Sequence, residues 1–242
     1  MNRTLFLAGA AGAIGRRLVP LLIADGWRVV GTTRSSAKAA TLHDLGAEVV
    51  ILDVFDAPVL AAAVAQASPA VVVQQLTDLP PGLDPAHMVE GTVRNARIRD
   101  EGTRHLIAAA VRGGAQRFVA QSIAFAYAGE RLPHREEDPL AVEAEGRTGV
   151  SARGVASLER QVLEAAFVGI VLRYGRLYGP GTGFGVPWGP APLHVDAAAR
   201  AALLAVAHGE AGVYNITEDD GTVTSEKAKR ELHWTADWRI PS

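Results

Sequence analysis

Short runs of consecutive apolar residues alternate along the chain with segments in which apolar residues recur every three or four positions. Runs such as Thr4–Ala8 and Val71–Val73 predict strands that are buried on both faces, because a half-exposed strand alternates apolar and polar residues. Segments such as Ile14–Asp25 and Ala57–Ala67 have the spacing of helices with one apolar face. The alternation predicts a parallel sheet covered by helices on both faces, which is an α/β fold.

The same pattern assigns the rest of the chain. It predicts strands at residues 4–8, 28–32, 48–52, 70–74, 117–121, 170–173 and 212–216, and helices at 14–25, 36–45, 57–67, 93–112, 155–166, 196–207 and 225–232. The proline-containing segment Leu76–Glu90 and the Gly/Pro-rich segment Tyr178–Pro192 are predicted loops. The polar segment Glu130–Val150 has no period and is interpreted as a surface excursion near the ligand pocket.

Composition bounds the class of protein. With 242 residues, of which 48% are hydrophobic, the chain suits a single domain over 1–242, in which 174–242 contributes a small C-terminal substrate lobe. A net charge of -2 gives no general attraction to nucleic acid or to an anionic membrane. The chain has no cysteine, which excludes disulfides, thiolate metal sites and cysteine nucleophiles. No segment is apolar for long enough to span a bilayer, and we expect a cytoplasmic protein.

A glycine-rich loop, Gly9-Ala-Ala-Gly12-Ala13-Ile14-Gly15, follows the first predicted strand and opens the first predicted helix. In such loops the first glycine permits a tight turn, the second lets the backbone approach a pyrophosphate, and the third lets helix and sheet pack closely. The free N–H groups and the dipole of the helix N-terminus then favour the anion. The strand, the spacing and the helix together predict a bound dinucleotide.

Residues at the ends of the next strands refine this prediction. Arg34 and Ser35 follow the second strand, where an acidic residue would bind the ribose hydroxyls of NAD. An arginine there suits a 2′-phosphate and favours NADP, with NAD as the alternative. Asp53 ends the third strand and either accepts a hydrogen bond from the adenine amine or closes a turn. Gln74 and Gln75 follow the fourth strand, and we expect them to line the cofactor cleft.

Several later segments complete a family pattern. After the glycine loop come Gly102-Thr103, the segment Arg117–Ser122 leading to Tyr127, and Leu172–Tyr174 followed by Tyr178–Gly181. In this order they resemble the extended short-chain dehydrogenase/reductase family, the NAD-dependent epimerase/dehydratases, over nearly the whole chain. The resemblance implies a Rossmann-type doubly wound parallel sheet with a small C-terminal substrate lobe. Typical members carry a much longer insertion after the segment that matches Tyr178–Gly181, so the resemblance implies a shortened lobe in this chain.

The resemblance breaks at the catalytic helix. Typical members carry a Tyr and a Lys four residues later; the Tyr transfers a proton while hydride moves at the nicotinamide, and the Lys lowers the pKa of the Tyr. Alignment on Glu159 places Ser151 at the tyrosine position and Val155 at the lysine position. The chain has no lysine at all between Lys38 and Lys227. It therefore resembles an atypical member whose proton must come from elsewhere.

Four residues are candidates to replace the missing pair. Tyr127 lies beyond the fifth strand, at the edge where ligands bind in such sheets, and is either a proton donor or a packing residue. Ser122 either touches the nicotinamide or substrate, or satisfies a backbone group at the strand end. Arg99 and Arg153 either supply the positive charge that the lysine usually provides, or lie exposed on their helices.

Together these features predict an NAD(P)-binding oxidoreductase or epimerase that acts on a small carbonyl or sugar-like substrate. The alternative is a dinucleotide-binding redox sensor or scaffold without turnover. His194 and Asp196 form either a catalytic dyad or a structural lead into a helix, and the segment His134–Asp138 lacks metal-ligand spacing, so no metal site is predicted. The resemblance also implies a homodimer, although Arg99, Arg104 and Arg112 charge one of the usual pairing faces.

Overall fold

A seven-stranded parallel sheet forms the centre of the protein in the computed structural model, which describes residues 2–241. Its strand order is β3-β2-β1-β4-β5-β6-β9. The bounds are β1 (Thr4–Ala8), β2 (Arg28–Thr33), β3 (Glu48–Ile51), β4 (Val71–Gln74), β5 (Arg117–Ile123), β6 (Val168–Tyr174) and β9 (Gly212–Ile216). The strand order reverses direction between β1 and β4, and this reversal opens a crevice at the carboxyl ends of the strands. The predicted Rossmann-type doubly wound sheet is confirmed.

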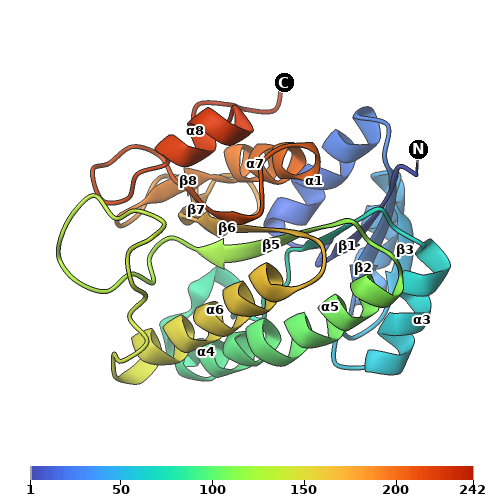
Figure 1. Cartoon of the computed structure of the whole chain (residues 1–242), viewed down its shortest axis with the longest axis horizontal. Coiled ribbons are helices and arrows are strands. Elements are labelled where there is room, and N and C mark those ends of the chain that lie inside the picture. The colour runs from blue at the N-terminus through green and yellow to red at the C-terminus, as the bar shows by residue number, and fades with distance from the viewer. Residues whose placement is uncertain (1, 242) are drawn as a thin grey trace.

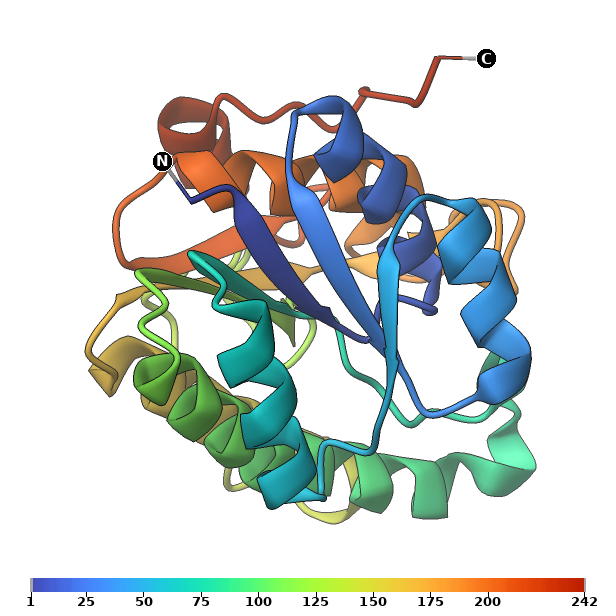
Figure 2. The ribbon, with the colours of Figure 1, turned by 90° about the vertical axis from the view of Figure 1, so that its right-hand side faces the viewer.

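Helices cover both faces of the sheet (Figures 1 and 2). One face carries α1 (Ala13–Ala24), α2 (Ser36–Asp44), α7 (Val195–Ala207) and α8 (Glu226–Leu232). The other face carries α3 (Ala57–Ala67), α4 (Met88–Arg97), α5 (Thr103–Arg112) and α6 (Gly146–Glu164). Within residues 2–241, no helix is both long and apolar enough to cross a membrane.

Strand β1 shows why the strands of this sheet are continuous apolar runs rather than alternating apolar and polar residues. All of its residues are buried, and successive side chains point to opposite faces. Leu5 and Leu7 therefore enter the core beneath α1 and α7, whereas Phe6 and Ala8 enter the core beneath α3 and α5. Each core is covered by its own helix layer, so the sheet is buried on both sides, as the sequence predicts.

The predicted helix Val93–Arg112 differs from the structure in two ways. Helix α4 already begins at Met88, five residues before the predicted start. Two short 3-10 turns precede it, η1 (Pro81–Leu83) and η2 (Pro85–His87). No proline follows Pro85 before the helix, so the chain can become helical directly after η2. A π-helical turn, η3 (Ile98–Gly102), then separates α4 from α5. A π turn places more residues in one turn than an α-helix does, so it changes which side chains face inward.

Helix α6 begins at Gly146, nine residues before the predicted start at Val155. Gly149 and Gly154 weaken the apolar period there, but they are packing residues: a Cβ on Gly154 would lie 3.0 Å from the Cα of Ala96 in α4. The predicted loop Tyr178–Pro192 is bounded by two short parallel strands, β7 (Arg176–Tyr178) and β8 (Pro192–His194), which pair with each other and form a second sheet.

Candidate dinucleotide-binding site

A cavity of about 420 Å³ opens at the carboxyl ends of β1 to β4, where the strand order reverses. Its wall combines the glycine loop with the residues that follow three neighbouring strands. The lining includes Gly9, Gly12, Thr33, Arg34, Ser35, Lys38, Asp53 and Gln75. The structure therefore brings together the glycine loop, Arg34, Ser35, Asp53 and Gln75, which the sequence analysis chose separately from four strand ends.

Two glycines of the loop leave no room for a side chain. Gly9 has φ +85°, and a Cβ there would lie 2.5 Å from the carbonyl oxygen of Gln75. A Cβ on Gly15 would overlap the main chain of Ala10. Gly9 is required for the turn that carries the chain past β4, and Gly15 for the close contact between α1 and the loop.

Gly12 has a different environment. A Cβ there would meet only the carbonyl oxygen of Gly9, at 3.4 Å, and the residue lines the cavity. Gly12 is also the N-cap of α1, and no side chain among residues 2–241 caps this helix end. The N–H groups of the first turn, which includes Ala13 and Ile14, are thus left for a ligand, while the side chain of Ile14 packs into the core.

The far end of the cavity is polar. Arg34 is half exposed, and its Nη2 lies 3.2 Å from Oδ1 of Asp78. Lys38 and Ser35 also line the cavity. Asp53 also lines the cavity, and its Oδ1 accepts a hydrogen bond from the N–H of Phe55 at 2.9 Å. The carboxylate of Asp53 therefore closes the turn after β3 and keeps its second oxygen for another donor.

The two glutamines after β4 have different surroundings. Gln74 is 1% exposed, and its Nε2 donates to the hydroxyl of Thr103 in α5 at 2.9 Å. Gln75 lines the cavity and donates to the hydroxyl of Tyr174 at 3.3 Å. The Oε1 of Gln75 is buried and accepts no hydrogen bond from residues 2–241. An unpartnered acceptor in the wall fits a hydroxyl or amide donor of a bound dinucleotide.

Ser122 and Tyr127 belong to a separate, buried network at the carboxyl ends of β5, β6 and β9. Glu159 of α6 and Arg173 of β6 form a bidentate ion pair with N–O distances of 2.6 and 2.8 Å. The hydroxyl of Ser122 donates to Glu159 at 2.7 Å. The hydroxyl of Tyr127 accepts from Arg173 at 2.7 Å and donates to Asn215 at 2.6 Å.

This network fixes the protonation of the Tyr127 phenol. Burial raises its pKa to about 12, against the opposing influence of Arg173. Hydrogen bonds to Glu159 keep the pKa of Arg173 above its ordinary value despite burial. At neutral pH the phenol therefore keeps its proton, and that proton is already engaged with Asn215. Ser122 is fully buried and is likewise engaged.

Helix α6 carries the departures from the family pattern. Val155 is fully buried in a small apolar cluster. Ser151 accepts a hydrogen bond from Nη1 of Arg99, at 3.0 Å on its hydroxyl. Arg153 points elsewhere, because its Nη1 donates to the carbonyl of Val142 at 2.8 Å. Of the two candidate arginines, only Arg99 reaches the position that matches the tyrosine.

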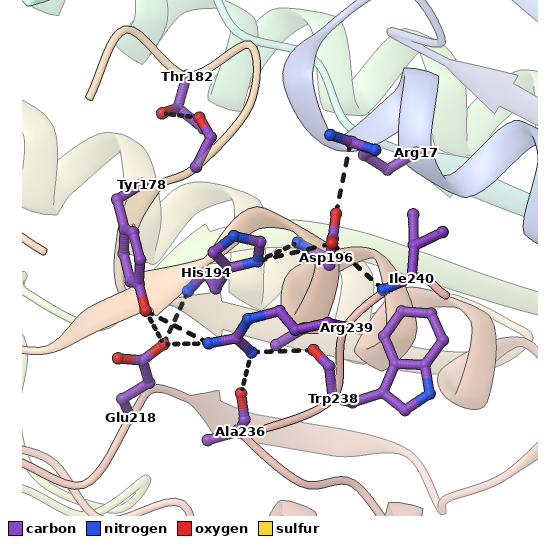
Figure 3. Close-up of polar contacts among 12 residues, drawn as sticks. Arg17, Tyr178, Thr182, His194, Asp196, Glu218, Ala236, Trp238, Arg239 and Ile240 are labelled. Carbon is purple, nitrogen blue, oxygen red and sulfur yellow. Dashed lines mark hydrogen bonds and ion pairs between the residues drawn. The ribbon is translucent and has the colours of Figure 1, made fainter. Parts of the chain in front are cut away.

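A further polar cluster holds the C-terminal segment (Figure 3). The hydroxyl of Tyr178 donates to Glu218 at 2.7 Å, and Arg239 contacts the same two groups at 3.4 and 3.6 Å. The N–H of Ile240 donates to Asp196 at 3.2 Å. These contacts fasten residues 239 and 240 to the end of β7 and to the start of α7.

His194 is a helix cap within this cluster. Its Nδ1 accepts a hydrogen bond from the backbone N–H of Asp196 at 3.2 Å. The backbone N–H of His194 donates to the carboxylate of Glu218 at 3.1 Å. Asp196 lies opposite Arg17 of α1, at 3.4 Å. The side-chain separation of 3.8 Å between His194 and Asp196 is longer than a hydrogen bond, so the contacts assign His194 to the cap rather than to a dyad. Among residues 2–241, no group of three or more metal-ligand side chains converges.

Comparisons with known proteins agree with this geometry. Residues 9–145 match the family described as NAD(P)H-binding. A 3-diazoavenalumate denitrifying reductase of a Streptomyces species is 40% identical over 241 aligned positions, which cover 88% of this chain and 75% of that protein.

Solved structures show the same fold at low identity. The UDP-glucose 4-epimerase of Thermotoga maritima, in complex with UDP-glucose, superposes with a TM-score of 0.78 at 19% identity, over 97% of this chain and 94% of the other. The Bordetella bronchiseptica enzyme WbmG, in complex with NAD, gives 0.77 at 17% identity, over 99% and 91%. The chain belongs to the NAD(P)H-binding family and has the fold of the NAD-dependent epimerase/dehydratases.

Proposed function

We propose that the protein is an NADPH-dependent reductase of a small electrophilic substrate. The observation that carries the proposal is the composition of one cavity. The glycine loop lines it together with Arg34, Ser35 and Lys38, and no acidic residue stands directly after β2. Arg34 provides a planar set of donors for a 2′-phosphate. NAD, which WbmG binds, is the competing dinucleotide.

The residues of the cavity fit a dinucleotide, and each part of the dinucleotide would contact a different set of them. The N–H groups at the start of α1 would hold the pyrophosphate beside Gly12. Asp53 would accept a hydrogen bond from the adenine end, and Oε1 of Gln75 would accept one from the ribose or carboxamide end. When bound, the cofactor supplies a hydride.

Proton supply restricts the substrate. Hydride addition to a carbonyl leaves an alkoxide that needs a proton, and the prediction that Tyr127 or Ser122 provides it stays untested. Their hydrogen bonds support a positioning role instead, since both hydroxyl protons are engaged inside the network. Substrates that need no proton from the protein therefore suit this site best.

The name of the Streptomyces relative suggests one such substrate class. Replacement of a diazonium group by hydride breaks the carbon–nitrogen bond, forms a carbon–hydrogen bond and releases N2. The two electrons come from NADPH, which becomes NADP⁺, and no proton is consumed. We include aryl diazonium compounds with small carbonyl and sugar-like compounds as the substrates to screen.

A binding titration tests the cofactor, with NADPH and NADH fluorescence as the readout. We expect NADPH to bind more tightly than NADH, and Arg34→Ala to weaken NADPH by about tenfold with little effect on NADH, because one charge-assisted contact is lost. Arg28→Ala is the matched control, since Arg28 is equally exposed but begins β2 at the opposite edge of the sheet. Equal losses of both nucleotides in Arg34→Ala would remove the argument for NADP.

Turnover separates the reductase from the sensor or scaffold. We expect NADPH oxidation with at least one of the three substrate classes. Tight NADPH binding without oxidation of any of them would instead favour a dinucleotide sensor, and a failure to bind either nucleotide would contradict both functions.

A further inference from the structure

Arg99 is a buried cation that contacts no carboxylate within residues 2–241. It is 7% exposed, and its hydrogen bonds go from Nη1 to the hydroxyl and carbonyl oxygens of Ser151, at 3.0 and 3.4 Å. Among residues 2–241, no acceptor is bonded to its Nε or Nη2, and no acidic group lies within ion-pair distance. The hydroxyl proton of Ser151 is likewise given to no acceptor in that range.

The side chain of Arg99 points toward the ligand edge of the sheet. Asp100, the next residue, is bonded to Ser157 of α6, whereas Arg99 is bonded to Ser151 of the same helix. Ser151 lies about 9 Å closer than Ser157 to the N-terminus of α6, because a helix rises about 1.5 Å per residue. Crossover helices of a parallel sheet begin at the carboxyl ends of the strands. The preceding residue, Ile98, lines the dinucleotide cavity, so the backbone of Arg99 in the π turn lies next to the wall of that cavity.

The charges around Arg99 do not balance. Glu159 is the nearby buried acid, but both of its oxygens are bonded to Arg173. One buried carboxylate therefore faces two buried guanidinium groups. Burial lowers the pKa of Arg99 to about 10, and Glu159 offsets this only in part. A buried charge without a partner is costly, and it is retained where a ligand supplies the opposite charge.

We propose that Arg99 and Ser151 bind the carboxylate of a small organic acid, next to the dinucleotide. The free donors are Nε and Nη2 of Arg99 and the hydroxyl of Ser151, which match a ligand that only accepts hydrogen bonds. This inference names the substrate class of the reductase and rests on the proposed function. The carboxylate anchors the acid, while its electrophilic group faces the nicotinamide end of the cavity.

Calorimetric titration of the NADPH-saturated protein tests the anion site. The probes are benzoate and cinnamate, with benzamide as the neutral isostere of benzoate. We expect the carboxylates to bind at least tenfold more tightly than benzamide. Arg99→Met should lose at least tenfold in benzoate affinity, and Ser151→Ala about threefold, because one donor of the set is removed. Arg153→Met, an exposed arginine on the same helix, is the control and should change nothing.

Thermal unfolding distinguishes a ligand site from a structural arginine. Removal of a buried charge that lacks a partner should leave the Tm of Arg99→Met equal to or a few degrees above that of the wild type. A lowered Tm that Arg99→Lys restores would assign Arg99 a structural role and overturn the proposal. Equal affinity for benzoate and benzamide, or unchanged benzoate binding in Arg99→Met, would also overturn it.

The two proposals fail separately. If NADPH does not bind the wild type, the reductase proposal fails, and the comparison of benzoate with benzamide on the free protein still decides the anion site. If NADPH binds and no carboxylate does, only the anion site fails.

Discussion

The two halves of the carboxyl edge of the sheet carry polar residues of opposite kinds. On the β1–β4 half, the polar groups line a cavity. Within residues 2–241, Oε1 of Gln75 has no hydrogen-bond partner, and Arg34 is half exposed beside Asp78. On the β5–β6–β9 half, Ser122 and Arg173 are both bonded to Glu159, and Tyr127 is bonded to Arg173 and Asn215.

This difference separates binding from stability. A polar side chain at a ligand edge is available to a ligand only when its donors and acceptors are not already used. Among residues 2–241, Oε1 of Gln75 on the first half meets that condition, whereas the hydroxyls of Ser122 and Tyr127 on the second half do not. Perturbation of the first half should change ligand affinity, and perturbation of the second should change the free energy of unfolding.

The largest expected effect is on the buried ion pair. Glu159→Gln should lower the free energy of unfolding by about 3–5 kcal/mol, because it leaves Arg173 buried without a counter-charge. Chemical denaturation measures the loss, and the NADPH affinity of the folded protein should stay within about twofold.

Glu48→Gln is the matched control for this change. Glu48 and Arg28 form a bidentate pair with N–O distances of 2.6 Å, but both are exposed, so little stability should be lost. Similar losses in the two variants would show that burial does not decide the strength of these pairs.

The next effect separates steric fit from backbone strain. Gly9→Ala adds a Cβ 2.5 Å from the Gln75 carbonyl at φ +85°, and we expect NADPH affinity to fall at least tenfold. Gly114→Ala has a comparable φ of +76° with nothing within 4 Å, so it carries the backbone cost alone and should leave affinity unchanged. Nucleotide fluorescence measures both, and an equal loss in Gly114→Ala would attribute the effect to general destabilisation.

A pH series addresses the phenol on the other half. The folded pKa of Tyr127, about 12, exceeds the unfolded value near 10, so its contribution to stability is complete below pH 10 and is lost as the pH rises toward 12. Tyr127→Phe should cost about 1–2 kcal/mol at neutral pH, and the gap to the wild type should narrow above pH 10. A pH-independent gap would contradict the raised pKa, and weakened NADPH binding in Tyr127→Phe would place the phenol in the ligand site instead.

The smallest effect concerns competition for Arg34. Asp78 lies 3.2 Å from Arg34 and 3.4 Å from Arg94, so it holds a guanidinium that a 2′-phosphate would need. Asp78→Asn should tighten NADPH by about two- to fivefold and change NADH less. The ratio of the two dissociation constants is the measurement, and an unchanged ratio would mean that Asp78 does not compete.

Sequence reasoning succeeds where the determining residues are neighbours in the chain. The glycine loop, its strand and its helix lie together within residues 4–24, and Arg34 follows its strand directly. The partners of Ser122 and Tyr127 are 37 and 88 residues away, so their hydrogen bonds are set by packing that no local pattern encodes.

The start of α6 and the direction of the Arg99 side chain could not be predicted from the sequence for related reasons. The early start of α6 depends on Gly149 and Gly154, which weaken the helical pattern but allow close packing on α4. The inward direction of Arg99 depends on the π turn, which shifts the helical period within Ile98–Gly102. The absence of the family's lysine points to α6 from the sequence alone. The structure adds that the guanidinium group of Arg99 contacts Ser151 on this helix.

The bidentate contact between Glu159 and Arg173 also constrains how the chain can diverge. Loss of either residue alone leaves an uncompensated buried charge, whereas a matched apolar pair at both positions is nearly neutral. Related chains should therefore carry both residues or neither, and intermediates with one of them should be short-lived in evolution. The two positions are 14 residues apart in the chain, yet we expect them to be inherited as a unit.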